Sequence, residues 1–568
     1  NRRGGNLEHQ QSGLLWNLDN WVYTTYNPMR FKFKKDRVIV DSLDNMPSGQ
    51  WGLTQDEMGI MYYSSAGSEN PAYGFQQAAV YGDYNPKGRL SEGFMEPWPI
   101  VGTPDIQGGP KRLREDSTLN HFTGVAGQEI FLGHRLPPST YGDLFIPEPV
   151  GRLIRRAKVR VEDGKKVLYN AYDQAEFMAS TDLNFRPVQA KTGPDGALYV
   201  VDMYRGIIQE SNWTRKGSHI RPHILRKDLD KNIGRGRIYR IVHEEIEPDG
   251  KPNLKGKSAS ELVDYLGHPN GWYRMTAQQL IVLKDDQSVV PALKSLASSN
   301  ISFFDRIFNS DKDFGIERVH ALWTLEGLGV VDRSLLLEKL KDEDPRVRVT
   351  AIRLAETFLK SGDSDFIPQL KTLVADTSVQ VVNQLALSLR YSRSEAATDL
   401  LTEIQGKYQQ NEIIAHAVEE SLKKDDSRLE QLKLTIAKRP LHDKRSILSG
   451  YDIYKQLCIT CHGPDLKGVV TDNGVAIAPP LLGSPRVTGD PNKLSKILLN
   501  GLVGPVDGVD YGIMTSYKGN GDQWITDVLN YVRSMNDVDA FHRREVRNAR
   551  IQTKDREDFW TLEELSKE

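Results

Sequence analysis

The segment Cys458-Ile459-Thr460-Cys461-His462 determines what kind of domain the C-terminal part of this chain forms. The chain has two cysteines, both lie in this segment, and the pattern is C-x-x-C-H. Each thiol can add to one vinyl group of a porphyrin, and the histidine that follows can then bind the iron. A small disulfide, two buried thiols and a C-x-x-C redox pair are the other interpretations. None of them requires the histidine, so we predict one covalent haem c on Cys458 and Cys461, with His462 as an axial ligand.

A haem iron with one histidine ligand needs a second axial ligand, and two methionines follow the motif. Met514 lies in the Gly-flanked segment Tyr511-Gly512-Ile513-Met514-Thr515-Ser516-Tyr517, and Met535 lies late in a predicted helix. Because loops can present a side chain across an edge of the haem, we predict Met514 as the ligand and keep Met535 as the alternative. A thioether opposite a histidine raises the reduction potential and favours electron transfer over oxygen binding.

The segment Ala478-Pro479-Pro480-Leu481-Leu482-Gly483 is predicted to pass beside His462. A backbone carbonyl there, from Pro479 or Pro480, would accept the imidazole Nδ1–H and fix the tautomer. Of the two we name Pro480. If the segment is only a packing loop, the ligand set is unchanged.

Two helices are predicted to flank the haem motif. Gly450 and Tyr454 lie on the first, and Tyr531 lies on the second, so a close crossing of the two is expected at these residues. With this arrangement, residues 446–540 resemble a class I cytochrome c.

Length and composition are those of an ordinary globular protein of about three or four domains. Of 568 residues, 39% are hydrophobic and 26% are charged, and the formal net charge is −2. No basic patch interleaved with aromatics indicates nucleic acid, and no window reaches the ~18 apolar residues of a membrane span. The chain opens on Asn1-Arg2-Arg3-Gly4-Gly5 with no visible signal peptide. We therefore expect it to start inside a domain.

Residues 1–245 are predicted to be β-structure, because short apolar and aromatic runs alternate with turn residues. One strand–turn–strand unit recurs, as in Gly193-Pro194-Asp195-Gly196-Ala197-Leu198-Tyr199-Val200-Val201-Asp202. Recurrence of such a unit predicts a β-propeller of about four or five blades, incomplete at its N-terminus. A plain β-sandwich is the alternative.

Residues 256–440 change to helical periodicity. Leu335–Leu340 is followed by Asp344-Pro345-Arg346 and then by a second apolar helix, a pattern that resembles HEAT-type repeats. Such repeats form a curved scaffold or docking surface. We expect His320 and Trp323 in this region to be core residues rather than ligands.

Residues 541–568 form a charged tail that ends in Phe559-Trp560-Thr561-Leu562-Glu563-Glu564-Leu565. We expect a solvated segment whose Phe, Trp and Leu side chains pack on another domain.

The order of the three regions resembles large multidomain proteins of planctomycetes, verrucomicrobia and some bacteroidetes. These join a sorbosone-dehydrogenase-like propeller, HEAT repeats and a terminal haem c domain, and are often labelled membrane-bound dehydrogenases. Outside the haem motif, the most specific matches are residues 193–206 and the tail Trp560–Leu565. The resemblance covers almost the whole chain.

The segment that begins Glu8-His9-Gln10-Gln11-Ser12-Gly13 resembles the soluble glucose/sorbosone dehydrogenase propellers. This resemblance implies that His9 is a catalytic base facing pyrroloquinoline quinone, with calcium as a second cofactor. A base would remove a hydroxyl proton while a hydride passes to the quinone. An inter-blade hydrogen bond is the other interpretation of His9. The first turn departs from the family pattern, because it is Leu18-Asp19-Asn20 rather than Pro-Asp-Gly.

Other residues of the β region have simpler interpretations. Arg152, Arg205 and Arg221 are conceivable anion contacts, but surface or blade-bridging roles are expected. Asp195 and Asp202 are expected to be turn and strand-end residues. Blades before His9 are missing, so a closed quinone site would need a preceding segment or another chain.

The sequence therefore predicts a c-type cytochrome of the periplasm or cell surface, because covalent haem attachment implies maturation outside the cytoplasm. Its partners would be a redox protein and a carbohydrate substrate, and its β region would oxidise a sugar or alcohol. The alternative is a non-catalytic electron carrier whose propeller and HEAT repeats bind partners or glycans.

Overall fold

The computed structural model describes most of the chain, and the chain divides into two compact units. One unit spans Gln10–Lys423, and the other contains Lys424–Glu568. The described residues are 12–25, 29–34, 37–43, 50–65, 69–98, 102–103, 106, 109–208, 214–298, 312–392, 394–422, 432, 434–470 and 476–568. In this part of the chain, no helix has the length and hydropathy needed to cross a bilayer.

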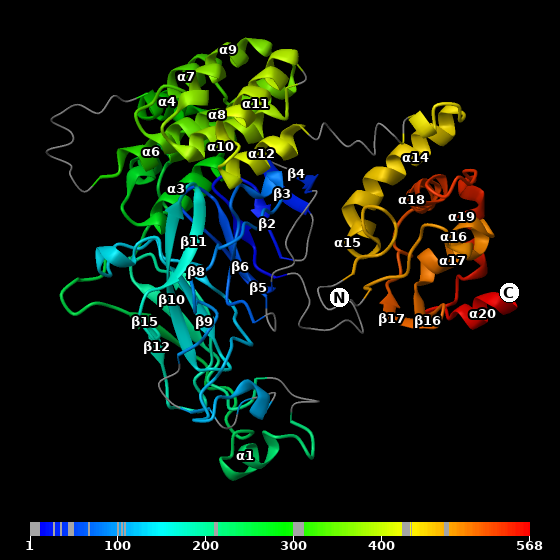
Figure 1. Ribbon diagram of the computed structural model, residues 1–568, viewed down its shortest axis with the longest axis horizontal. Helices are drawn as coiled ribbons and strands as arrows, with labels where there is room; N and C mark the ends of the chain where they lie inside the picture. Colours follow the sequence, from blue (N-terminus) through cyan, green and yellow to red (C-terminus); the bar gives the residue numbers. More distant parts are fainter. Residues whose placement is uncertain are drawn as a thin grey trace. The chain divides into compact units, whose positions relative to one another are not determined.

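The β region contains four antiparallel sheets in which most strands that are neighbours in sequence are paired in space (Figure 1). The first holds β1 (Leu15–Trp16), β2 (Val22–Tyr23), β3 (Met29–Lys34) and β4 (Arg37–Ser42), and the second holds β5 (Gln50–Gln55), β6 (Met61–Ser64) and β7 (Tyr73–Gly74). The third holds β8 (Glu129–Ile130), β9 (Leu144–Glu148), β10 (Leu153–Glu162), β11 (Lys165–Asn170) and β12 (Met178–Ala179). The fourth holds β13 (Pro187–Thr192), β14 (Leu198–Asp202) and β15 (Arg237–Ile241).

Turn residues explain why consecutive strands pair. Asp163 and Gly164 join β10 to β11 with φ of 50° and 86°, the conformation that a two-residue hairpin turn requires at both positions. Asp195 sits in the β13–β14 turn, where it accepts hydrogen bonds from the Ala197 amide and the Tyr199 hydroxyl. Asp202 accepts from the Arg186 amide at the end of β14. Both aspartates are therefore turn and strand-end residues.

Each of the four sheets contains a run of strands in consecutive order, as a propeller blade does, and in the third sheet β12 pairs with β10 outside this run. None of the sheets in the described residues closes on itself. The sheet-rich character of the region is established, and the propeller ring stays a prediction.

The middle of the chain is helical and is built from helices stacked in pairs. Four helices form one layer in which each packs on the next, namely α6 (Phe314–Gly327), α8 (Pro345–Lys360), α10 (Val379–Leu389) and α12 (Glu412–Leu422). Asp344 caps α8 by accepting from the Arg346 amide, and Pro345 occupies the first helical position. The helices are α2 (Ala259–Val263), α3 (Gly271–Lys284), α4 (Val290–Ser298), α6 (Phe314–Gly327), α7 (Arg333–Lys339), α8 (Pro345–Lys360), α9 (Ile367–Lys371), α10 (Val379–Leu389), α11 (Glu395–Tyr408) and α12 (Glu412–Leu422).

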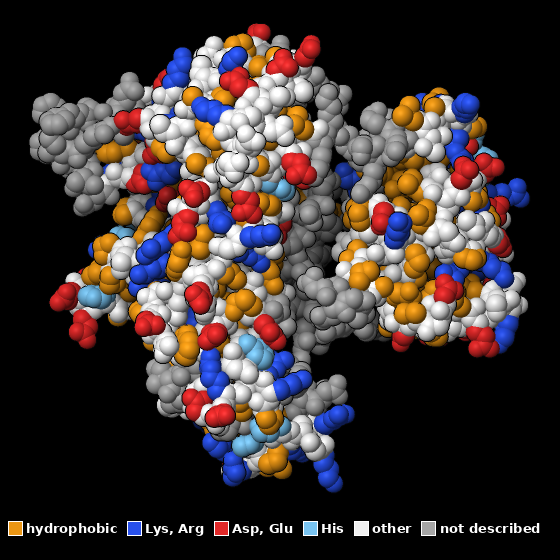
Figure 2. Space-filling model, viewed as in Figure 1, with side chains coloured by type: hydrophobic (Ala, Val, Ile, Leu, Met, Phe, Trp, Pro, Cys, Tyr) orange, Lys and Arg blue, Asp and Glu red, His pale blue; other side chains and the backbone are white. Residues whose placement is uncertain are grey.

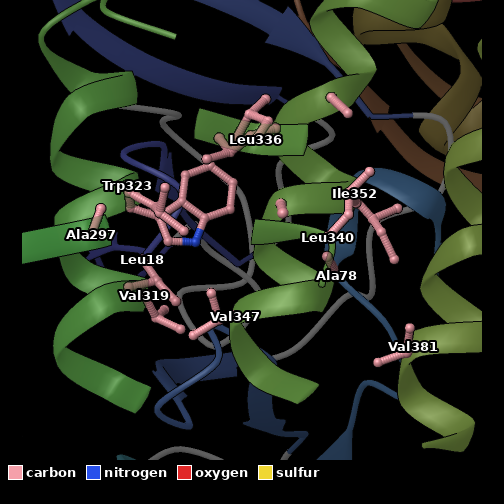
Figure 3. Close-up of a cluster of buried hydrophobic side chains, with 14 of the residues drawn as sticks. Leu18, Ala78, Ala297, Val319, Trp323, Leu336, Leu340, Val347, Ile352 and Val381 are labelled. Carbon is pink, nitrogen blue, oxygen red and sulfur yellow. The ribbon is translucent and has the colours of Figure 1, made fainter. Parts of the chain in front are cut away.

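The β region and the helices share one hydrophobic core. Leu18, Ala78 and Tyr81 from the β region belong to the same buried cluster as the inner faces of α3 to α12. Figure 3 shows Leu18 beside Val319 and Trp323 of α6. Trp323 is buried, as expected for a core residue.

Polar side chains fix the turn Leu18-Asp19-Asn20 against the helices. The Gln278 amide of α3 donates to the Leu18 carbonyl and to Asn20 Oδ1, at 2.8 and 2.9 Å. His320 is buried and its Nδ1 lies 2.7 Å from Gln278 Oε1. The turn that departs from the family pattern is thus a contact between the β region and the helices.

The second unit is mostly helical. Its elements are α14 (Leu441–Ile453), a π-helical turn η10 (Tyr454–Cys458), α15 (Ile459–His462), α16 (Pro485–Thr488), α17 (Pro491–Asn500), β16 (Leu502–Val506), β17 (Val509–Met514), α18 (Asp522–Ser534), α19 (Arg543–Gln552) and α20 (Leu562–Lys567). The remaining α-helix of the described residues, α1 (Arg221–Arg226), is not part of this unit and lies in the first one. Helices α14 and α18 pack extensively on each other.

The charged tail packs on the haem-motif unit itself, and the expectation that it packs on another domain is wrong. Trp560 and Leu565 are buried in one cluster with Ile497, Leu502 and Val506. A short backbone bridge to Leu502 brings Trp560 against this unit. Helix α20, which follows at once, buries Leu565 on the same unit.

Candidate haem site

The C-x-x-C-H motif lies at the end of a continuous helical segment. Helix α14 runs into the π-helical turn that ends at Cys458, and α15 carries Cys461 and His462. The helix stops at Gly463, whose φ of 71° favours glycine. The Tyr454 hydroxyl donates to the Gly463 carbonyl at 2.7 Å and so ties the end of the motif back to its start.

Neither cysteine forms a disulfide within the described part of the chain. Cys458 is partly buried against the core and Cys461 is exposed. Burial, with a smaller contribution from Cys461, raises the pKa of the Cys458 thiol to about 12. The disulfide interpretation of the motif is therefore not the state that the structure shows.

His462 is oriented by a backbone carbonyl. Its Nδ1 lies 3.1 Å from the Pro479 carbonyl oxygen, so Nδ1–H donates and Nε2 is left to bind a metal. The residue that accepts is Pro479, and the choice of Pro480 is wrong, because successive carbonyls of an extended segment point in different directions. Burial lowers the pKa of His462, which favours the neutral imidazole that binds metals.

A close helix crossing supports the motif, and its residues are those predicted. Tyr531 of α18 lies 5.3 Å from Tyr451 and 5.0 Å from Tyr454, measured between ring centroids. At Gly450 a Cβ atom would lie 1.9 Å from the Asp527 carbonyl oxygen. Only glycine allows α14 and α18 to approach this closely.

Replacing Gly450 by alanine is expected to lower the free energy of unfolding of this unit by about 1–3 kcal/mol, because the new methyl group must push α18 away. Gly519→Ala is the matched control in the same unit, since a Cβ there meets no atom within 4 Å. Urea denaturation of both variants checks this. Equal stability of the two would show that the crossing is not tightly packed.

Met514 lies at the end of a strand, whereas the sequence predicted a loop. It is the last residue of β17 and pairs with Leu502 of β16. Its side chain and that of Cys458 pack against the same buried cluster. Met535 is the C-cap residue of α18 and is 36% exposed.

The motif and the loop that follows it present apolar side chains to solvent. Leu457, Val470, Ile477 and Leu482 are all exposed, by 37–59%, and Figure 2 shows hydrophobic side chains at the surface of this unit. Two thiols, an oriented imidazole and an apolar surface are the features that a covalently attached porphyrin needs. The residues present therefore fit haem c.

The β region contains a separate cavity of about 400 Å³. It lies beside β1, β5 and β13, each of which is the first strand of its sheet. Its lining residues are Ser12, Gly13, Leu14, Leu15, Trp51, Gly52, Leu53, Val188, Gln189 and Lys191. Arg152, Arg205 and Arg221 are not among them. His9 lies outside the described residues, three positions before Ser12.

Glycines let the first strands of the four sheets converge, a feature that the sequence analysis missed. A Cβ at Gly13 would lie 3.2 Å from Gly52 Cα, and a Cβ at Gly52 would lie 3.2 Å from Gly127 Cα. A Cβ at Gly127 would lie 2.2 Å from the Val188 carbonyl oxygen. One glycine at or near the start of each of the first three units, Gly13, Gly52 and Gly127, was a signal for this in the sequence.

The fold and motif of the second unit define a c-type cytochrome domain. Residues 447–536 match the family model described as Cytochrome c, and this part of the chain is a cytochrome c domain. Residues 2–245 match a family model described as a domain of unknown function, DUF7133.

Comparison with whole proteins adds little. A search of curated proteins found no match. A solved structure described as a putative oxidoreductase (glucose dehydrogenase) from Thermus thermophilus is 14% identical, covers 37% of this chain and 82% of its own, and has a TM-score of 0.19. A similarity at this TM-score carries no argument.

Proposed function

We propose that the protein is an exported electron-transfer protein whose cytochrome c domain binds one haem c, with His462 and Met514 as axial ligands. The observation that carries this proposal is the motif on α15 with the His462 Nδ1–H held by the Pro479 carbonyl. A bound haem c supplies one-electron oxidation and reduction at its iron. The chain holds the His462 imidazole in place, and the Met514 thioether would be the second side chain to bind the iron.

Replacing Met514 by alanine is expected to abolish the long-wavelength sulfur-to-iron absorption band, lower the reduction potential and let the ferrous protein bind carbon monoxide. Met535→Ala is the matched control and is expected to keep the band. Absorption spectra of the oxidised variants check both. Loss of the band in Met535→Ala with retention in Met514→Ala would assign Met535 as the ligand.

A second function, for the β region, is favoured by its cavity. The volume of about 400 Å³ is in the range of small-molecule sites. We propose that the region oxidises a sugar or alcohol and passes the electrons to the cytochrome domain and a redox partner. Pyrroloquinoline quinone with calcium would supply the hydride acceptor, and His9 would remove the hydroxyl proton. Lys191 is the one cation among the described lining residues, and its ammonium group is paired with the Glu129 carboxylate at 2.8 Å. In the described ranges, no group of three or more His, Cys, Asp or Glu side chains is placed to hold a metal ion.

Substrate-dependent reduction of the haem separates this proposal from that of a non-catalytic carrier. The haem-loaded protein is mixed with pyrroloquinoline quinone, calcium and a panel of sugars and alcohols, and the reduced haem spectrum is followed. Reduction that requires both cofactor and substrate supports the dehydrogenase. No reduction with any substrate supports the carrier, in which the propeller-like and HEAT-like regions bind partners or glycans.

A further inference from the structure

We propose that the C-terminal tail clamps the segment that presents Met514, and that Trp560 is the positioning residue of this clamp. The inference rests on the proposed function, because it takes Met514 as the axial ligand. It concerns residues 541–568, which lie beyond the matched cytochrome c region.

The tail extends the small sheet that carries Met514. In β16, Leu502 pairs with Met514 on one side and forms a parallel bridge with Trp560 on the other. The Val503 amide donates to the Trp560 carbonyl at 2.8 Å, and the Trp560 amide donates to the Gly501 carbonyl at 3.0 Å. Met514, Leu502 and Trp560 therefore lie in one row across three backbone segments.

Side-chain packing also joins the tail to the strand that ends at Met514. Trp560 is 3% exposed and belongs to a buried cluster against which Met514 packs. A Cβ at Gly501 would lie 2.4 Å from the Met514 carbonyl oxygen and 2.7 Å from Phe559 Cδ1. Gly501, with φ of 82°, is what lets the tail and the Met514 strand approach each other.

The segment that follows Met514 is tied to the tail as well. The ammonium group of Lys518 donates to three tail carbonyls, those of Thr553, Lys554 and Arg556, at 3.2, 3.1 and 2.9 Å. In return, the Arg550 guanidinium donates to the Lys518 and Asn520 carbonyls at 2.5 and 2.6 Å. Tail contacts thus hold the chain on both sides of Met514.

Contacts within the tail hold Trp560 itself. The Arg556 guanidinium lies 3.6 Å from the centre of the Trp560 ring and donates to Glu564 at 2.9 Å. Thr561 and Glu564 form a capping box at the start of α20. The indole is therefore fixed by stacking and by the helix that follows it.

These contacts determine how rigidly the Met514 side chain is held in position. A side chain at a strand end keeps its position only if the backbone around it is fixed, and here the fixing contacts come from the tail. Because a thioether ligand raises the reduction potential of a haem, releasing the strand is expected to lower it.

The test uses the full-length, haem-loaded protein with Trp560→Ala and Trp560→Phe. Trp560→Ala is expected to lose most of the sulfur-to-iron band, to have a lower reduction potential and to bind carbon monoxide in the ferrous state, with the covalent haem content unchanged. Trp560→Phe is expected to keep the band, because the buried indole N–H has no hydrogen-bond partner among the described residues and the ring alone is needed.

Two further variants keep the test decisive. If Trp560→Ala does not fold, Lys518→Ala removes the second set of tail contacts and should weaken the band, whereas the exposed Lys554→Ala should not. Met514→Ala with an intact band overturns the ligand assignment. Loss of the band in Met514→Ala, but not in Trp560→Ala or Lys518→Ala, overturns the clamp alone, even if those variants melt at lower temperature.

Discussion

Replacing both Cys458 and Cys461 by alanine is expected to abolish covalent haem attachment completely. The chain has no other cysteine, so no thiol remains to form a thioether. The measurement is haem staining after denaturing electrophoresis, together with the mass of the intact chain. The expected result is full loss of both the stain and the haem mass.

The two single variants are the controls for this prediction. Cys458→Ala and Cys461→Ala each leave one thiol beside His462, so each is expected to carry haem through one thioether, with a shifted spectrum of the reduced pyridine complex. Haem that stays on the double variant through denaturation would contradict covalent attachment at the motif.

The second large effect is expected in the other unit, at the buried carboxylate of Asp19. Asp19 accepts from the Tyr23 hydroxyl at 2.8 Å and pairs with Arg353 of α8 at 3.3 Å. Its side chain and that of Arg353 are 6% and 8% exposed. Replacing Asp19 by alanine leaves a buried guanidinium without its partner, which costs about 3–5 kcal/mol.

Glu403 supplies a control in the same unit, since it pairs with Lys371 at 3.7 Å and the two side chains are 49% and 67% exposed. Glu403→Ala is expected to cost no more than about 1 kcal/mol, because exposed pairs contribute little. Denaturation curves that separate the two units check both variants, and the haem unit should melt unchanged. Equal losses for Asp19 and Glu403 would show that the contact between the β region and the helices is not a buried ion pair.

Local features of the site could be predicted from the sequence. The C-x-x-C-H motif is contiguous, and Gly450 and Tyr531 stand out because a close helix crossing needs a residue without a side chain opposite a large one. The alternating β and helical patterns likewise predicted a sheet-rich region followed by a helical one, because each period reports one local structure.

Two kinds of feature could not be predicted from the sequence. One is the direction of a single backbone carbonyl, and the other is a contact between residues far apart in the chain. Pro479 and Pro480 are adjacent and chemically alike, and only backbone geometry decides which carbonyl faces His462. The glycines around Met514 indicated a loop, but the turn at Asp507-Gly508 makes a hairpin of this segment. The roles of Asp19 and Trp560 follow from partners far away in the chain, which no local pattern reports.

The most direct test of the electron-transfer assignment is a spectroelectrochemical titration of the haem-loaded protein with carbon monoxide added to the reduced form. We expect one reversible one-electron transition, with the sulfur-to-iron band in the oxidised state and no carbon monoxide complex in the reduced state. Prompt formation of a carbon monoxide complex, with no such band, would show an open coordination position and contradict a haem held by His462 and Met514.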